Sequence, residues 1–250
     1  MQIITKYLME NCNDLNQNSI YCPNMRNFKE ECLHSIDRDK RYYKKKSKDT
    51  KTRYIARNRN GDEISSHNYQ SWKNIPIIKT TVEKLDLKNI KVRRAGVIIY
   101  TIENGTMYFG LGLDSRSHDL TDFGGGVVYK TDYNVIRGAL REFEEETLGI
   151  FESLSFEDIK HCLVMHDDNN LIIFMHINMN PNIICQEFNN KYQQIIERNN
   201  IVFGNKYYPE VCGITWLTLD EFRNSIMDTG IIFTRVRQFL WRADKFTHLL

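Results

Sequence analysis

The sequence predicts an α/β/α sandwich built around a mixed sheet and preceded by a smaller, strongly basic region. Three observations support this fold class. Strand-like and helix-like hydrophobic periods alternate along residues 88–250, tight turns join several of the strand-like segments, and an acidic amphipathic helix follows a glycine-rich loop. A chain of 250 residues with 41% hydrophobic content can also bury a full core. We therefore expect the sandwich over residues 88–250 and a basic, helical region over residues 1–87.

The first strands are predicted from hydrophobic runs that flank turn residues. Residues 92–102 read as a strand, Asn104-Gly105 as a tight hairpin turn, and residues 107–113 as the returning strand. Residues 162–166 and 171–178 form a second predicted hairpin. The acidic and amide residues between them are typical of a turn.

The C-terminal elements follow the same logic. Residues 211–216 read as a further strand, and Thr218 with Glu221 forms a capping box that starts the next helix. A last amphipathic helix is predicted over residues 234–246. Its apolar side carries Val236, Phe239, Leu240 and Phe246.

A central helix is predicted between the glycine loop and Gly149. Thr131 or Asp132 is a suitable N-cap residue, and Gly149 follows the last periodic position, where a left-handed residue commonly ends a helix. One side of this helix is apolar and is expected to be buried. It carries Ile136, Leu140, Phe143 and Thr147.

The other side of this helix carries three carboxylates. Residues three and four apart are neighbours on a helix surface, so Glu142 lies one turn below both Glu145 and Glu146. Three like charges this close repel one another unless a cation neutralises them. Carboxylate oxygens favour a hard divalent cation, so we expect Mg²⁺ or Mn²⁺ here. Gly125 and Gly126 precede the helix and leave backbone that a substrate can approach closely.

At this point the residues resemble the Nudix hydrolases, whose box reads G-x5-E-x7-R-E-U-x-E-E-x-G-U, with U an aliphatic residue. The segment from Arg141 to Glu146 matches the R-E-U-x-E-E core, with an aromatic Phe143 at the U position. Two departures are visible. Asp132 stands where the family has Glu, with eight residues rather than seven before Arg141, and a two-residue Thr-Leu pair precedes Gly149 where the family has one residue.

The resemblance covers residues 88–250 and implies a Nudix α/β/α sandwich. It also implies hydrolysis of a nucleoside diphosphate linked to another moiety, with metal held by Glu142, Glu145 and Glu146. Arg141 is then a residue that orients a helix carboxylate through its guanidinium fork, with a surface ion pair as the alternative. Glu210, which precedes a tryptophan-containing strand, is the expected further catalytic carboxylate. Weaker candidates for that role are Glu187, Asp167 and Asp168.

The formal net charge of only +2 hides a strongly basic stretch at residues 38–59, in which tyrosines alternate with Lys and Arg. Such a stretch can neutralise a nucleic-acid backbone and stack on its bases, although a lysine-rich run is more often simply solvated. The residues expected to contact RNA are Lys44, Lys45, Lys46 and Lys48.

Six cysteines form no CxxC pair, and we expect free thiols in a reducing compartment. A zinc site at Cys12, Cys22, Cys32 and His34 is the less favoured reading, because the spacing is unlike common zinc motifs. No segment has a signal-peptide or membrane-spanning pattern, so we expect no membrane partner and a cytoplasmic location. The bias toward Asn, Ile, Lys and Tyr is typical of AT-rich genomes and compatible with a large DNA virus, in which case the location is the host cytoplasm.

Three functional hypotheses remain open from the sequence. The first is a pyrophosphohydrolase acting on the 5′ cap of mRNA, because the basic stretch accompanies a resemblance to decapping enzymes of large DNA viruses. The second is a housekeeping hydrolase of small nucleotides, such as nucleoside triphosphates, dinucleoside polyphosphates or nucleotide sugars. The third is a non-catalytic protein that binds nucleotide or RNA. The sequence does not indicate an oligomeric state.

Overall fold

The computed structural model describes residues 20–21, 76–151, 153–203, 209–227 and 231–243. The chain divides into one unit of residues 1–23 and 77–250 and a second unit of residues 24–76. Residues 24–75 lie outside the described residues, so the first unit alone is described here. The predicted basic stretch, with Lys44, Lys45, Lys46 and Lys48, and the cysteines at 12, 22 and 32 also fall outside them.

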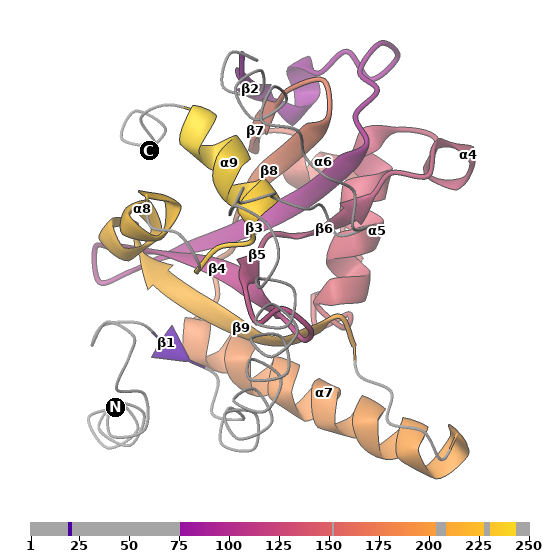
Figure 1. Ribbon diagram of the computed structural model, residues 1–250, viewed down its shortest axis with the longest axis vertical. Coiled ribbons are helices and arrows are strands. Elements are labelled where there is room, and N and C mark those ends of the chain that lie inside the picture. Colours follow the sequence, from indigo (N-terminus) through magenta and orange to yellow (C-terminus); the bar gives the residue numbers. More distant parts are fainter. Residues whose placement is uncertain (1–19, 22–75, 152, 204–208, 228–230, 244–250) are drawn as a thin grey trace, which may run out of the picture. The chain divides into compact units, whose positions relative to one another are not determined.

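The described residues form a mixed sheet with the strand order β1-β9-β4-β3-β8-β7-β2 (Figure 1). Strand β5 pairs with β4, and β6 pairs with β3. Only β3 and β8 run parallel among these paired strands. The strands are β1 (Ile20–Tyr21), β2 (Ile78–Thr81), β3 (Arg94–Glu103), β4 (Thr106–Asp114), β5 (Leu120–Thr121), β6 (Phe123–Gly126), β7 (Leu163–His166), β8 (Asn170–His176) and β9 (Val211–Thr218).

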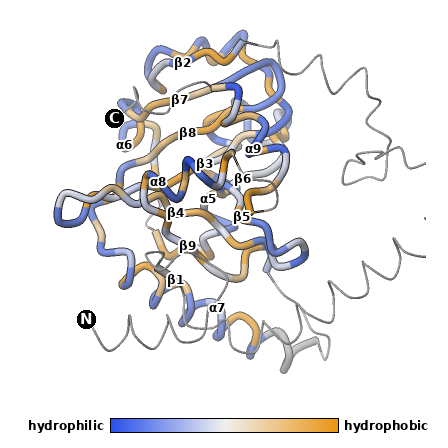
Figure 2. Tube along the Cα trace, turned by 60° about the vertical axis from the view of Figure 1, so that its left-hand side comes forward, coloured by the Kyte–Doolittle hydropathy of each residue, from blue (hydrophilic) through white to orange (hydrophobic). Residues whose placement is uncertain are grey.

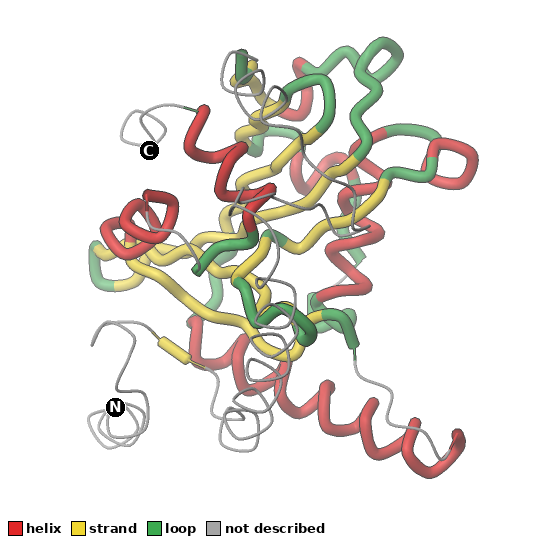
Figure 3. Tube along the Cα trace, in the orientation of Figure 1, coloured by secondary structure: helices red, strands yellow, loops and turns green. Residues whose placement is uncertain are grey.

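Helices cover both faces of this sheet (Figure 3). Phe109 of β4 stacks on Phe222 of α8 with ring centroids 4.5 Å apart, which places α8 on one face. Phe123 of β6 meets Phe143 of α5 edge to face at 5.7 Å. Phe123 pairs with Val97 and Phe109 with Tyr100, and since these β3 residues are three apart, their side chains and those of their partners point to opposite faces. The helices are α4 (Tyr129–Asp132), α5 (Val135–Glu146), α6 (Phe156–Ile159), α7 (Pro181–Phe203), α8 (Leu219–Met227) and α9 (Thr234–Arg242), with a 3₁₀ turn at Val82–Lys84.

The predicted α/β/α sandwich around a mixed sheet is therefore confirmed. Orange, hydrophobic stretches lie along central strands such as β4 and β8 (Figure 2). The core includes fully buried Trp216 of β9, Ile98 and Ile99 of β3, and Phe188 of α7. Strands β1 and β2 precede residue 88 and still pair into the sheet, while the domain boundary at 87/88 stays a prediction.

Both predicted hairpins are confirmed. In the first, Asn104 and Gly105 have φ values of 51° and 76°, the left-handed conformation that a two-residue turn between β3 and β4 requires. In the second, β7 and β8 pair antiparallel, and the turn is closed by Asp167, whose Oδ1 accepts hydrogen bonds from the backbone N–H groups of Asn169 and Asn170 at 2.7 Å.

The start of the central helix differs from the prediction. The N-cap of α5 is Asn134, whose side chain accepts a hydrogen bond from the Arg137 N–H at 3.0 Å, and neither Thr131 nor Asp132 has this role. Those two residues belong to the short helix α4, which ends at Asp132 and is followed by its C-cap residue, Tyr133. Asp132 is buried, and its carboxylate is bound by Arg141 instead. At the other end Gly149 is left-handed, with a φ of +64°, as predicted, but Leu148 before it is left-handed as well, with a φ of +58°.

The C-terminal elements are of the types predicted from the sequence, a strand followed by two helices. The capping box is present, since the Glu221 carboxylate accepts from the Thr218 N–H at 2.8 Å and the Thr218 hydroxyl accepts from the Glu221 N–H at 3.3 Å. Helix α9 buries Val236, Phe239 and Leu240, whereas Phe246 lies outside the described residues. The long helix α7 was not predicted. In the described part of the chain, no helix combines the length and apolarity needed to cross a bilayer.

Candidate active site

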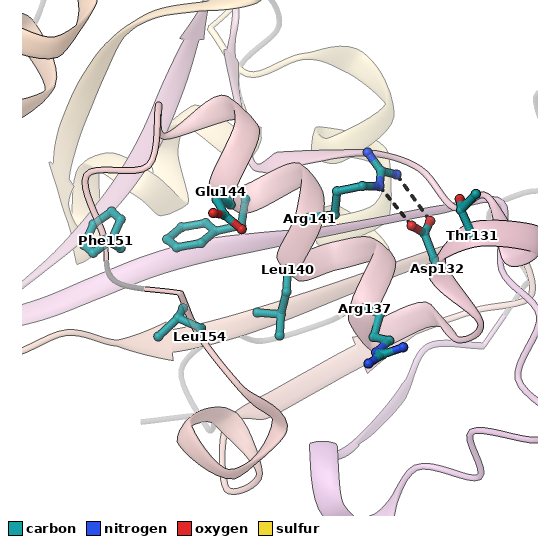
Figure 4. A pocket seen from close by; sticks show the side chains of 9 residues that line it. Thr131, Asp132, Arg137, Leu140, Arg141, Glu144, Phe151 and Leu154 are labelled. Atoms are coloured by element: carbon teal, nitrogen blue, oxygen red, sulfur yellow. Dashed lines mark hydrogen bonds and ion pairs between the residues drawn. The ribbon is translucent and has the colours of Figure 1, made fainter.

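Arg141 of α5 links the acidic residues of the central helix to the loop before it. Its Nε donates to Asp132 Oδ1 at 2.9 Å, and its Nη2 donates to Asp132 Oδ2 at 3.3 Å and to the Gly126 carbonyl at 3.0 Å. Figure 4 shows the two contacts with Asp132 as dashed lines. These hydrogen bonds lower the pKa of Asp132, against the effect of burial. Asp132, shorter than the family's Glu, therefore ties α4 to α5 through this guanidinium.

The same guanidinium also reaches two of the predicted metal ligands. Arg141 Nη1 lies 2.9 Å from Glu142 Oε1 and 3.3 Å from Glu145 Oε2. Arg141 thus contacts two helix carboxylates, while its role in orienting a metal ligand stays a prediction. The repulsion among the helix glutamates, which the sequence suggested a metal would relieve, is partly offset by this arginine.

Glu142 packs against the glycine loop. A Cβ atom on Gly125 would lie 2.4 Å from the Glu142 carboxyl carbon, so the carboxylate occupies the space that a side chain at residue 125 would need. Burial raises the pKa of Glu142, while Arg141 opposes the rise. Gly125 is therefore required for this close approach.

Glu146 lies one turn further along α5 and is partly buried. Its Oε2 accepts a hydrogen bond from the Gly124 N–H at 2.7 Å. Burial, with the negative charge of Asp122 adding to it, raises the pKa of Glu146 to about 8. No Lys, Arg or His among the described residues forms an ion pair with Glu146. Glu146 is thus drawn into the protein without an ion-pair partner among the described residues, and the nearby positive charge of Arg94 only partly opposes the rise in its pKa.

Glu145 differs from its two neighbours. Its side chain is 61% exposed, and its described contact is the one with Arg141. Over the described residues, no three Asp, Glu, His or Cys side chains converge as a ready-made cage for a metal ion. A hard cation such as Mg²⁺ does not need one, because it keeps several waters and is usually held by one or two carboxylates together with substrate phosphates. The oxygen donors of Glu142 and Glu146 fit such an ion.

A buried ion pair that sequence reasoning missed lies beneath this face. Arg94 of β3 binds Asp122 through Nη1–Oδ2 and Nη2–Oδ1 distances of 2.6 and 2.7 Å. The two side chains are 11% and 0% exposed. A usable signal was present: Asp122 directly precedes Phe123 and the glycine triplet, and Arg94 directly precedes the apolar run of residues 95–99.

Glu210 is exposed at the start of β9. Its carboxylate lies 3.8 Å from Arg116 Nη2, with both side chains more than half exposed, and no other ion pair involves it within the described part. Asp167, one of the weaker candidates, is bound by Arg242 of α9 and is almost fully buried. The catalytic role of Glu210 stays a prediction.

The two departures from the family's spacing fall at the ends of α5. Tyr133 has a φ of +66° and Leu148 a φ of +58°, conformations that non-glycine residues seldom adopt. Tyr133 is the residue between α4 and the Asn134 cap, and Leu148 directly precedes Gly149. Each extra residue is therefore accommodated outside the helix, and the spacing of its glutamates is unchanged.

A pocket of about 320 Å³ lies beside α5, and its lining includes Asp132 and Arg141 (Figure 4). Arg137, Leu140 and Glu144 line it from the helix, and Phe151 and Leu154 line it from the segment that follows. These helix residues lie roughly half a turn around the axis from Glu142, because each residue advances the helix by about 100°.

No protein-family model matches this chain, and no curated protein matches it. Solved structures that resemble it include the Nudix domain of Shewanella oneidensis NrtR complexed with ADP-ribose. That match has 10% identity, covers 72% of this chain and 97% of that one, and has a TM-score of 0.35. Two C. elegans Ap4A hydrolase structures also match. The binary complex has 14% identity, covers 64% of this chain and 100% of that one, and has a TM-score of 0.35. The other structure has 17% identity, covers 62% of this chain and 98% of that one, and has a TM-score of 0.31.

Proposed function

We propose that this protein is a divalent-metal-dependent Nudix pyrophosphohydrolase that cleaves a nucleoside diphosphate linked to another moiety. The observation that carries the proposal is the meeting of Glu142 and Glu146 with the glycine loop, at the helix whose sequence resembles the Nudix box. A structural acidic helix has no need to draw carboxylates against backbone at the cost of raising their pKa values.

In this proposal, Glu142, Glu145 and Glu146 hold Mg²⁺ or Mn²⁺. When bound, such a cation would polarise phosphoryl oxygens and lower the pKa of a water molecule. The chain's own residues do the rest. Arg141, itself held by Asp132, keeps Glu142 and Glu145 in place. Gly125 makes room for Glu142, and the open space beside Gly126 leaves the loop backbone accessible to a substrate phosphate, with both glycines as proposed substrate contacts. Glu210 stays the proposed further carboxylate.

We further propose capped RNA as the substrate and the cytoplasm as the location. The support for RNA is the basic stretch in the sequence, with Lys44, Lys45, Lys46 and Lys48 as proposed contacts to the phosphate backbone. The support for the cytoplasm is that the six cysteines of the sequence show no CxxC pair and no spacing typical of a disulfide framework. Hydrolysis of small nucleotides is the alternative substrate class.

A substrate panel tests the activity. Purified full-length protein would be assayed with Mg²⁺ and with Mn²⁺ on cap-labelled RNA, dinucleoside polyphosphates, ADP-ribose and nucleoside triphosphates. We expect metal-dependent release of a nucleotide product from at least one of them, and loss of that release in Glu146→Gln. Binding without turnover of any of these compounds would contradict the enzyme proposal and support the non-catalytic alternative.

A salt series separates the two substrate classes. Because released counterions drive backbone binding, replacing the four lysines with Ala should weaken RNA binding and flatten its salt dependence. Hydrolysis of a small nucleotide should not change. Equal RNA binding by both proteins would remove the basic stretch from the proposal and leave small nucleotides as the substrate.

A further inference from the structure

The buried pair of Arg94 and Asp122 is difficult to explain as a source of stability. Both charges are removed from water, and the side chain of Asp122 is completely buried. The loss of hydration in such a pair often cancels the attraction between the charges, so an apolar pair of similar shape is frequently as stable. A role other than stability is therefore expected for this pair.

The pair is connected to the glycine loop by a specific contact. Besides binding Asp122, Arg94 Nη2 donates to the Gly124 carbonyl oxygen at 2.8 Å. The N–H group of the same glycine donates to Glu146 at 2.7 Å. Both backbone polar groups of Gly124 are thus bound by ionisable side chains, one from β3 and one from α5.

The backbone around this contact has little freedom to adjust. A Cβ on Gly124 would lie 2.3 Å from the Gly96 Cα, and a Cβ on Gly96 would lie 2.2 Å from Asp122 Oδ2. The two strands and the ion pair fit together only because neither residue has a side chain. A shift of the pair would consequently move Gly124, and with it the hydrogen-bond partner of Glu146.

We propose that Arg94 and Asp122 are positioning residues for the metal-binding carboxylates: the bidentate pair fixes Gly124, and Gly124 fixes the carboxylate of Glu146. This inference rests on the proposed function, because it requires Glu146 to hold the cation. Neither Arg94 nor Asp122 needs to touch the substrate.

A charge-neutral double variant tests positioning apart from electrostatics. Replacing the pair by Arg94→Met and Asp122→Leu in the full chain removes one positive and one negative charge, so the net charge near the helix glutamates is unchanged. Mn²⁺ affinity would be measured by calorimetric titration, together with the thermal unfolding midpoint. We expect a folded protein whose Kd for Mn²⁺ rises by about 10-fold or more, as when residues that orient metal ligands are changed.

Another buried ion pair, within the described part of the chain, supplies a matched control. Arg242 and Asp167 have side chains that are 6% and 1% exposed, and they join α9 to the turn between β7 and β8. The variant Arg242→Met with Asp167→Asn also removes one charge of each sign and keeps the acceptor that the turn uses. Its Mn²⁺ affinity should equal that of the wild type.

Arg94→Lys provides a test that does not depend on the double variant folding. Lysine keeps the charge but cannot bind a carboxylate bidentately and reach Gly124 at the same time. Weakened Mn²⁺ binding by Arg94→Lys supports the positioning role, whereas wild-type affinity in this variant shows that the charge alone is needed and overturns that role.

If the wild type does not bind Mn²⁺, or if Glu146→Gln binds it equally well, the proposed metal site fails. If the wild type binds Mn²⁺ and the Arg94→Met, Asp122→Leu double variant binds it with the same Kd, the positioning inference is overturned while the proposed metal site stands.

Discussion

The two sides of helix α5 carry the same kinds of residue in different surroundings. On one side, Glu146 contacts Gly124 and Arg141 binds Asp132, Glu142 and Glu145. On the other side, Glu144 is exposed, and Arg137 lies over the Tyr133 ring with its Cζ 5.5 Å from the centroid. This difference shows that neighbouring glutamates in one acidic run can have different structural roles. The neighbouring backbone decides which glutamate is drawn into the protein.

The largest expected contrast is between Glu146→Gln and Glu144→Gln. Glutamine keeps the size of the side chain but is a poorer ligand for a hard cation, so Glu146→Gln should lower turnover by roughly 100-fold or more. Glu144→Gln should leave turnover near the wild-type value. Steady-state rates on the substrate identified by the panel measure both. Equal losses in the two variants would mean that the sides of α5 do not differ in function.

A second contrast compares the two arginines in stability. Arg141→Met leaves the buried Asp132 carboxylate without its charged partner and should lower the free energy of unfolding by about 2 kcal/mol. Arg137→Met removes an exposed contact with an aromatic ring, and its cost should stay below about 1 kcal/mol. Urea unfolding at pH 7 measures both. A similar cost for the two variants would show that the Arg141 network adds little to the fold.

The pH dependence of stability isolates Asp132 within that network. Hydrogen bonds from Arg141 lower the pKa of Asp132 below its ordinary value of 3.8. The folded state therefore favours the charged carboxylate, and this stabilisation is present above that ordinary value and is lost as pH falls through the lower pKa of the folded state. The difference in unfolding free energy between wild type and Asp132→Asn should have its full value at pH 6 and should become smaller as the pH falls below 3.8. Glu144→Gln controls for the general loss of one carboxylate. A difference independent of pH would rule out this coupling.

The smallest effect is expected at Tyr133 on the outer side. Its left-handed backbone is unfavourable for a residue with a Cβ, and its side chain is 71% exposed. Tyr133→Gly should therefore raise stability by up to about 1 kcal/mol. Lys130→Gly, within the short helix α4, should lower it. Urea midpoints measure both, and a destabilised Tyr133→Gly would mean that the contact with Arg137 outweighs the backbone strain.

The elements that could be predicted from sequence are those encoded by nearby residues. The hairpin at Asn104-Gly105, the capping box at Thr218 and the glycine after α5 each depend on a few consecutive side chains, and all are present. The carboxylate spacing on α5 is likewise local. These features need no knowledge of how distant strands pair.

The features that were missed depend on distant partners. Asp132 is a good N-cap by residue type, but Arg141 binds its carboxylate and Asn134 caps the helix instead. The Arg94–Asp122 pair joins residues 28 positions apart and exists only because β3 and β6 align in one register. The exposure of Glu145, compared with the burial of Glu146, likewise follows from where the glycine loop lies.

The left-handed residues at the two ends of α5 bear on how this helix tolerates insertions and deletions. One residue added within an α-helix turns everything beyond it by about 100°, which would rotate Glu142 away from Glu146. A residue added at Tyr133 or Leu148 changes the connecting backbone and leaves the rotational phase of the glutamates intact. Chain length can therefore vary at these two junctions, while the interval from Arg141 to Glu146 has to keep its length.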